Sequence, residues 1–210
     1  MATPSRAEAT RARLLEAAVA AFAEKGFHGT TTRDIAGAAG MSPAAMYVHH
    51  KSKEELLFLI SREGHEQALA TVRDARASAT DPVGQVAAVG RAFAMFHVQH
   101  HTVARVLNYE LAALSAEHRA EIDELRTGID RELRALVAAG VEAGAFDTPS
   151  PALAATALAS MGIDIARWYR EDGEWTPEEI GDYYADLALR LAGATGRPAV
   201  RGGRRPRAPR

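Results

Sequence analysis

The sequence predicts an all-α protein in which a small helix-turn-helix domain precedes a larger helical domain. Apolar residues recur with the α-helical period of about 3.6 residues, and no segment alternates apolar and polar residues for long, as a strand would. Three helix-start signals fall within residues 30–57, which read TTTRDIAGAAGMSPAAMYVHHKSKEELL. Two short helices followed closely by a longer one are typical of a helix-turn-helix motif and its connecting helix.

Local signals support each helix in turn. Residues 6–27, RAEATRARLLEAAVAAFAEKGF, place their larger apolar side chains on one face, and Gly26 is expected to end that helix. The next starts are expected where a side chain caps free amides or a proline follows the cap: Thr31 with Asp34, Ser42 with Pro43, and Ser52 with Glu55. Longer helices are predicted over residues 52–79, 83–100, 102–114, 116–144, 150–171 and 176–193.

Composition excludes several classes of protein. No run of about 18 apolar residues occurs, so neither a membrane span nor a membrane partner is expected. The N-terminal residues lack the apolar core of a signal peptide. The chain has no cysteine, which excludes disulfides, thiolate metal sites and a cysteine nucleophile. We therefore expect a cytoplasmic protein.

Charge is distributed unevenly, although the formal net charge is only −2. Residues 1–53 carry seven Lys and Arg against four Asp and Glu, a balance of +3, whereas residues 54–194 carry twelve against twenty-three, a balance of −11. Residues 195–210 add six arginines and no acid, in a Gly- and Pro-rich tail expected to be disordered. Only the basic N-terminal domain is expected to meet a polyanion.

Residues 43–49 have the features of a DNA recognition helix. The small residues at its start leave its N-terminal amides free to approach a base or a phosphate in the major groove. Tyr47 and His49 project where each side chain can donate to a phosphate oxygen, and Lys53 adds a cation. The alternative is a surface helix that only covers the first helix, and spacing alone does not decide between the two.

The run MSPAAMYVHHKSKEELL closely resembles the recognition segment of TetR-family transcriptional regulators, and LLEAAVAAFAEKGFHGTTTRDIAGAAG is similar to the family's first two helices. The resemblance covers about residues 8–60. It implies a homodimer on double-stranded DNA with a palindromic operator. It also implies DNA contacts by Thr31, Thr32, Arg33, Ser42, Ala44, Tyr47, His49 and Lys53.

The sequence departs from that family pattern at a few positions beside the expected DNA surface. His50 stands where an aromatic residue is usual, and Lys51 where a proline is common. Each either adds a phosphate contact or, for His50, packs less well than the aromatic residue. Pro43 occupies a position where a base-reading side chain often sits, so the base preference there is open.

Residues 54–194 are expected to bind a ligand and to form the dimer. Apolar residues at every fourth position favour a four-helix dimer interface made by the last two helices of each subunit. These stripes are Leu153, Ala157, Met161 and Ile165 in one helix, and Ile180, Tyr184, Leu187 and Leu191 in the other. The alternative is that both helices pack only inside one subunit.

Residues 118–193 look like the C-terminal domains of TetR-type regulators of fatty-acid or steroid catabolism, several of which bind acyl-coenzyme A thioesters. Such a ligand needs an apolar cavity with cations near its mouth. The expected lining is Phe93, Phe96, Leu107, Leu111, Met161 and Trp168, and the expected cations are Arg105 and Arg167. Plain core packing is the alternative. His97 and His101 are expected to face the pocket, with a metal site or backbone-bonded histidines as alternatives.

The resulting expectation is a ligand-responsive transcriptional repressor that a small-molecule effector releases from its operator. A regulator of the same family that responds to a drug or another metabolite is one alternative, and a ligand-independent DNA-binding protein is another. An enzyme is not expected, because no nucleophile elbow, phosphate loop or paired acid–base constellation occurs. No cofactor or metal ion is expected either.

Overall fold

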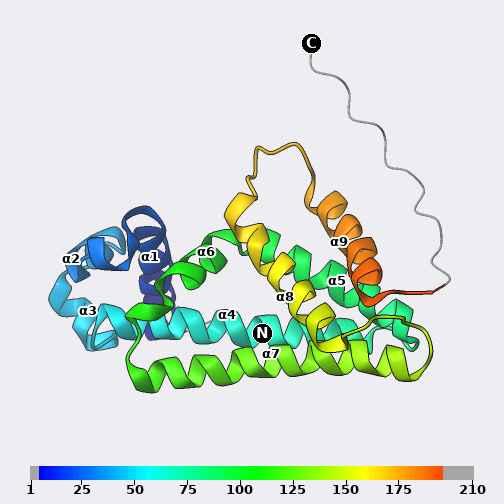
Figure 1. Ribbon diagram of the computed structural model, residues 1–210. Helices are drawn as coiled ribbons and strands as arrows, with labels where there is room; N and C mark the ends of the chain where they lie inside the picture. The colour runs from blue at the N-terminus through cyan, green and yellow to red at the C-terminus, as the bar shows by residue number, and fades with distance from the viewer. Residues whose placement is uncertain (1–4, 196–210) are drawn as a thin grey trace, which may run out of the picture.

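The computed structural model describes residues 5–195, which form α-helices joined by loops (Figure 1). No β-strand occurs in this range, so the all-α prediction is confirmed. The predicted disordered tail lies almost entirely outside the described residues. The elements are α1 (Arg6–Gly29), α2 (Thr32–Ala38), α3 (Pro43–His49), α4 (Lys53–Ala77), α5 (Pro82–Gln99), α6 (His101–Glu110), the 3-10 helix η1 (Leu111–Ala113), α7 (Ala116–Glu142), α8 (Pro151–Trp168) and α9 (Pro177–Ala192).

Side-chain caps begin the short helices where the sequence predicts them. Thr31, Ser42 and Ser52 each accept a hydrogen bond from the backbone amide three residues later. Gly26 breaks α1 with a φ of 70°, after which one further turn leads into the loop before α2. The predicted helix 102–114 is divided instead, because α6 ends at Glu110 and the chain continues as η1.

Two large hydrophobic cores lie one after the other along the molecule. The first packs α1, α2 and α3 against the first part of α4, α6, η1 and the start of α7. The second packs the rest of α4 and α7 with α5, α8 and α9. Figure 1 shows α4 and α7 side by side, passing from the α1–α3 end into the body. The first core therefore extends beyond the predicted domain boundary after residue 53.

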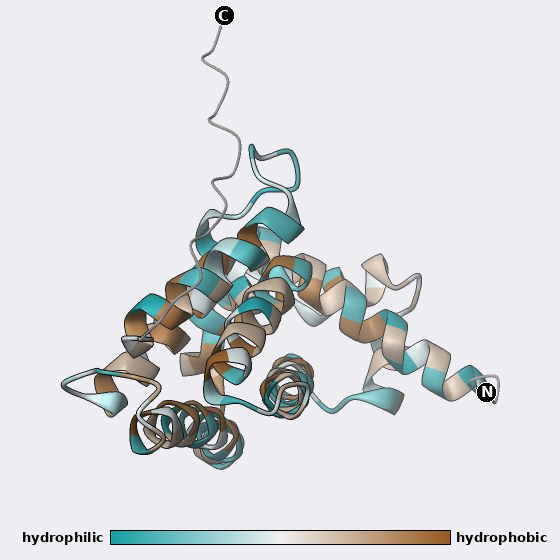
Figure 2. Cartoon of the chain, turned by 90° about the vertical axis from the view of Figure 1, so that its right-hand side faces the viewer, coloured by the Kyte–Doolittle hydropathy of each residue, from teal (hydrophilic) through white to brown (hydrophobic). Residues whose placement is uncertain are grey.

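A smaller third core lies where α5, α8 and α9 meet. It contains Ile165 and Ile180, which the sequence had assigned to a dimer-forming stripe. These two side chains pack inside the subunit because each faces α5 rather than the outer side of its helix. The loop between α8 and α9 is hydrophilic and stands away from the helices (Figure 2). Within residues 5–195, no helix has the length and apolar character needed to cross a membrane.

Candidate functional site

The helix-turn-helix is held together by local caps as well as by its core. Thr31 and Asp34 form a reciprocal capping box, in which Asp34 Oδ2 accepts from both the backbone amide and the hydroxyl of Thr31. These hydrogen bonds, with help from Lys25, lower the pKa of Asp34 to about 2. Met46 is completely buried beneath α3 and fixes that helix on the first core. The outer face of α3 is thus set rigidly.

Apart from Val48, the residues exposed on α2, on α3 and at the cap of α3 are small or able to donate a hydrogen bond. Arg33, Ser42 and Ala44 are exposed, and the Tyr47 hydroxyl lies 3.4 Å from Oγ1 of Thr32 on the neighbouring helix. Val48 is 81% exposed, which is unusual for an apolar side chain, and sequence reasoning did not assign it. An exposed branched side chain on a recognition helix suits contact with a thymine methyl group.

From the sequence we expected Lys53 to extend toward this surface, but in the structure it does not. Its Nζ donates hydrogen bonds to the backbone oxygens of Phe27, at 2.7 Å, and Thr30, at 2.8 Å, and lies 4.3 Å from the centre of the Phe27 ring. Both carbonyls lie at the end of α1, where Phe27 O also accepts from the backbone amide of Thr30 at 3.3 Å, and they draw the ammonium group inward. Lys53 therefore joins α4 to α1.

His50 does not take the first of its two expected roles, a contact with a phosphate. It is 4% exposed at the C-terminal end of α3, so its ring is packed inside rather than available to a phosphate. Its Nε2 has no hydrogen-bond partner, and burial lowers its pKa. The ring thus fills the place of the usual aromatic residue at the cost of an unpaired nitrogen.

A cavity of about 910 Å³ lies between the two large cores. Helices α1, α4, α5, α6, α7 and α8 all contribute to its wall. The predicted lining residues that do face it are Phe93, Phe96, His97, Leu107 and Leu111. Those that do not are His101, Arg105, Met161, Arg167 and Trp168.

Helical phase and local contacts explain why some of the predicted residues do not line the cavity. The lining positions include Ala104 and Leu107 of α6 and Leu111 of η1, whereas His101 and Arg105 fall on another face of α6. His101 bonds the backbone oxygen of Val98 at 3.0 Å instead.

The C-terminal end of α8 extends past the cavity. Arg167 lies one turn beyond Ile163, is exposed, and forms two hydrogen bonds to Asp164 at 2.7 and 2.9 Å. Trp168 packs edge-on against Trp175 instead of lining the cavity, so neither residue meets a ligand bound there.

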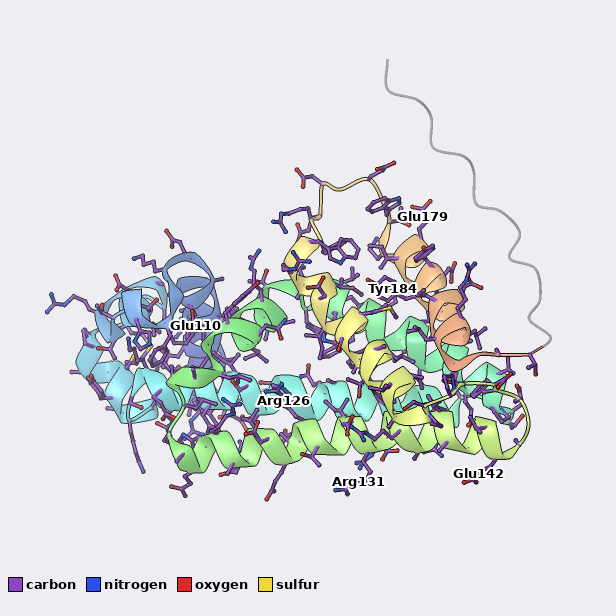
Figure 3. The ribbon with its side chains drawn as sticks, viewed as in Figure 1. Glu110, Arg126, Arg131, Glu142, Glu179 and Tyr184 are labelled. Carbon is purple, nitrogen blue, oxygen red and sulfur yellow. The ribbon has the colours of Figure 1, made fainter. Side chains whose placement is uncertain are left out.

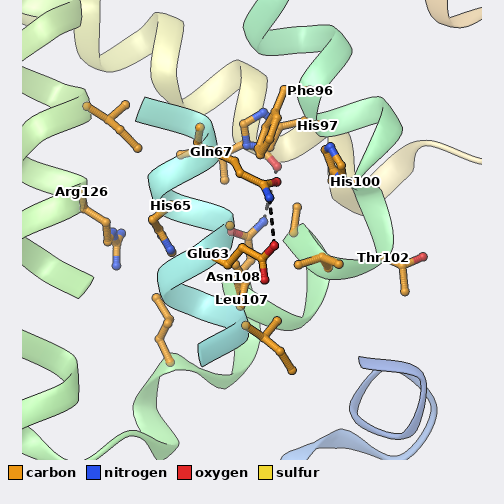
Figure 4. A pocket seen from close by; sticks show the side chains of 18 of the residues that line it. Glu63, His65, Gln67, Phe96, His97, His100, Thr102, Leu107, Asn108 and Arg126 are labelled. Atoms are coloured by element: carbon orange, nitrogen blue, oxygen red, sulfur yellow. Dashed lines mark hydrogen bonds between the residues drawn. The ribbon is translucent and has the colours of Figure 1, made fainter. Parts of the chain in front are cut away.

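Sequence reasoning missed the polar residues that α4 and α7 place in the cavity wall. Glu63, His65 and Gln67 come from α4 and Arg126 from α7, as Figure 4 shows. No local signal in the sequence marks these positions, because packing of α4 against α7 brings them together. Asn108 is a further polar residue at the rim, where it donates to Ile163 O at 3.4 Å.

The deepest polar residue is His97, which is 6% exposed and packs against Phe93 and Phe96. Its Nδ1 lies 2.8 Å from the backbone oxygen of Phe93. Burial lowers the pKa of His97 to about 4, more than this hydrogen bond can offset. His65 repeats the arrangement on α4, with Nδ1 2.7 Å from Ser61 O and a pKa that burial lowers.

A second set of contacts joins α4 to α7 at the end of the molecule where α1, α2 and α3 lie. Glu54 accepts a hydrogen bond from the backbone amide of Ser115 at 2.9 Å, and its carboxylate lies 2.8 Å from Nδ1 of His118. The His118 ring stacks on Phe58, with ring centres 3.8 Å apart. The first turn of α4 is therefore bound to the start of α7 through Glu54, as it is to the end of α1 through Lys53.

Models of known protein families match the N-terminal and the C-terminal part of the chain. Residues 14–60 match the model described as bacterial regulatory proteins, tetR family, and residues 79–192 match the tetracyclin repressor-like C-terminal domain. The HTH-type transcriptional repressor KstR2 of Mycobacterium tuberculosis is 33% identical over 192 residues, covering 88% of this chain and 92% of that protein.

Solved structures agree with these matches. A regulatory protein of the tetR family from Rhodococcus RHA1 is 38% identical with a TM-score of 0.84, covering 91% of this chain and 100% of that one. AibR, in complex with isovaleryl coenzyme A and operator DNA, is 25% identical with a TM-score of 0.78, covering 89% of this chain and 100% of that one. The chain therefore belongs to the TetR family of ligand-responsive, DNA-binding transcriptional regulators.

Proposed function

We propose that this regulator is a cytoplasmic homodimeric repressor that binds a palindromic operator and is released when an acyl-coenzyme A thioester enters the cavity. The observation that carries the proposal is the composition of the cavity wall. Leu15 and Val19 of α1 line it together with Ile60 and Gly64 of α4. Because α1 packs directly under the recognition helices, a ligand in the cavity contacts the DNA-binding part itself.

Release requires only that the ligand prefer the conformation that does not fit the operator. The two heads of a dimer must meet successive major-groove faces, roughly 34–36 Å apart or a multiple of that distance. A ligand that binds the non-fitting conformation about 100-fold more tightly supplies about 2.7 kcal/mol. Regulators typically bind their specific site more tightly than other DNA by about 4–10 kcal/mol, and the ligand's contribution of about 2.7 kcal/mol is a large fraction of that difference.

The charges around the cavity favour a ligand whose deep part is uncharged. Arg126 is the only Lys or Arg among the described residues that line it, whereas Glu16, Glu63, Asp123 and Asp130 are acids. A carboxylate on the buried part of the ligand would lie near these acids, and no cation deep in the cavity would neutralise its charge. The acyl group of a thioester is uncharged, and the phosphates would lie at the mouth, where Arg126 is 3.8 Å from Asp123. AibR, a similar protein, was solved with isovaleryl coenzyme A.

Operator release distinguishes these ligands directly. We would titrate protein–operator complexes with long- and short-chain acyl-coenzyme A, the matching free acids and coenzyme A alone, and follow release by fluorescence anisotropy. Arg126→Gln should weaken release by thioesters several-fold, whereas Arg167→Gln, outside the cavity, should not. If no thioester releases the operator and a cationic aromatic compound does, the effector assignment is wrong, and the acidic rim then explains the preference for a cation.

The dimer is expected to form through α8 and α9, which expose apolar side chains toward no partner within the subunit. Leu153 is 70% exposed on α8, and Tyr183 is 65% exposed on α9. Leu153→Glu and Tyr183→Glu should each shift the protein toward monomer in sedimentation velocity experiments. Arg131→Glu is the matched control, since Arg131 lies on α7 and points away from the body (Figure 3). Dimers that persist in both variants would place the interface elsewhere.

A further inference from the structure

The hydrogen-bonding state of His97 follows from its contacts. A backbone oxygen only accepts, so the Nδ1 that lies 2.8 Å from Phe93 O must carry the proton. Burial keeps the ring neutral at neutral pH because its pKa is lowered to about 4. The other nitrogen, Nε2, is then an unprotonated acceptor. The same reasoning gives His65 a protonated Nδ1 on Ser61 O and an Nε2 that accepts.

Both Nε2 atoms lack a partner and are open to the cavity. Within the described residues, the one buried side-chain nitrogen or oxygen without a hydrogen bond is Nε2 of His50. The Nε2 of His97 has no partner either, so it must touch accessible space although the residue as a whole is 6% exposed. His97 lines the cavity, and Figure 4 shows it beside Phe96 above the α4 residues. The accessible space at this nitrogen is therefore the cavity.

We propose that the effector carries a hydroxyl group, or an equivalent hydrogen-bond donor, on the part that enters the cavity, and that Nε2 of His97 accepts its hydrogen bond. This inference rests on the proposed function only in requiring that a ligand occupy the cavity. His65, whose ring is near enough to influence His97 electrostatically, supplies a second acceptor on the α4 side. A ketone or carboxylate oxygen at the same point would face a lone pair and leave the acceptor unpaired.

Other occupants fit the same nitrogens less well. A metal ion would need further ligands, and no group of three or more suitable side chains among residues 5–195 is placed to hold one. A cation is favoured only at the rim, where Glu16 and Glu63 lie on α1 and α4. At the depth of His97 the neighbours are the aromatic rings of Phe93 and Phe96, so an uncharged donor on an apolar skeleton matches best.

The test compares ligands that differ only in that donor. We would measure binding of a medium-chain secondary alcohol, the ketone of the same skeleton and the unsubstituted parent by calorimetry, and repeat the comparison with the corresponding hydroxyacyl-, oxoacyl- and acyl-coenzyme A thioesters. The hydroxyl position would be moved along the chain. In the wild-type protein the best hydroxyl compound should bind about tenfold more tightly than its ketone, the size of one net hydrogen bond.

Substitutions assign the preference to His97. His97→Phe keeps an aromatic ring but removes the acceptor, so the alcohol should lose its advantage while the parent binds as before. His97→Gln offers both a donor and an acceptor and should bind alcohol and ketone alike. His101→Phe is the matched control, because His101 also bonds a backbone oxygen in the same region but lies outside the cavity.

The outcomes separate this inference from the proposed function. If thioesters release the operator but hydroxyl and keto forms bind equally, or the preference survives in His97→Phe, the hydroxyl assignment is wrong and the regulator proposal stands. If no thioester binds while free alcohols still exceed ketones through His97, the acyl-coenzyme A proposal is wrong and the acceptor site stands.

Discussion

Replacing Lys53 tests whether this residue holds the fold or grips DNA. In Lys53→Met the apolar stem remains over Phe27, whereas the hydrogen bonds to Phe27 O and Thr30 O are lost. Hydrogen bonds to a charged group contribute about 1.5–3 kcal/mol each in net terms. Because Lys53 is only half-buried and water can reach the freed carbonyls, we take the lower end and expect a total loss of about 2–3 kcal/mol in unfolding free energy.

Urea denaturation and the salt dependence of operator binding together distinguish the two roles. Lys51→Met is the matched control, because Lys51 is exposed and its side chain has no partner among the described residues. We expect that variant to change stability by less than about 0.5 kcal/mol. Unchanged stability in Lys53→Met, with the salt slope reduced by about one unit, would show that Lys53 neutralises a phosphate and that the inward geometry is not the one that binds DNA.

The remaining predictions concern DNA affinity, pH and chain geometry. Tyr47→Phe should weaken operator binding by about 1–2 kcal/mol in anisotropy titrations, and equal affinity would remove its hydroxyl from the interface. His97 binds fewer protons in the folded chain than in the unfolded chain, so its contribution to stability should fall by roughly 3 kcal/mol as pH drops from 6.5 toward 4. His65 and His50, whose pKa values burial also lowers, should add to this fall. Urea titrations should show a smaller fall in His97→Phe; an identical pH profile would contradict this. Gly193→Ala should cost about 3 kcal/mol, because the new Cβ would meet Asp147 O at 1.9 Å, whereas Gly144→Ala, with the same φ of 70° and open space, should cost about 1 kcal/mol. Equal losses in urea denaturation would show that the clash relaxes.

Helix starts could be predicted because their causes are local. A cap joins a side chain to an amide three residues away, so the local sequence alone predicts the caps Thr31, Ser42 and Ser52. Prolines at the first position of α5, α8 and α9 act in the same way, by fixing φ where no amide is needed. The end of α6 was not predicted, since the change to η1 has no such local signal.

The direction of individual side chains depended on partners far away in the sequence. Lys53 turns inward because α1 ends beside it, and its acceptors are 26 and 23 residues away. The apolar half of the cavity, including Phe93 and Leu107, could be predicted from helical stripes. Its polar half could not, because His65 and Arg126 meet only after α4 and α7 pack side by side.

The positions of the two cores determine what a ligand can move. The first turn of α4 is bound to the end of α1 through Lys53 and to the start of α7 through Glu54, which accepts from Ser115 and contacts His118. A swing of α1, α2 and α3 alone would break these bonds, whereas a shift of the whole first core relative to the second would preserve them. The cavity lies between the cores, with Leu15 and Leu107 on one side and Phe93 on the other. A ligand there pushes against both, so we expect the DNA-reading unit to move together with the beginnings of α4 and α7, and the bending to fall within those two helices where they pass the cavity.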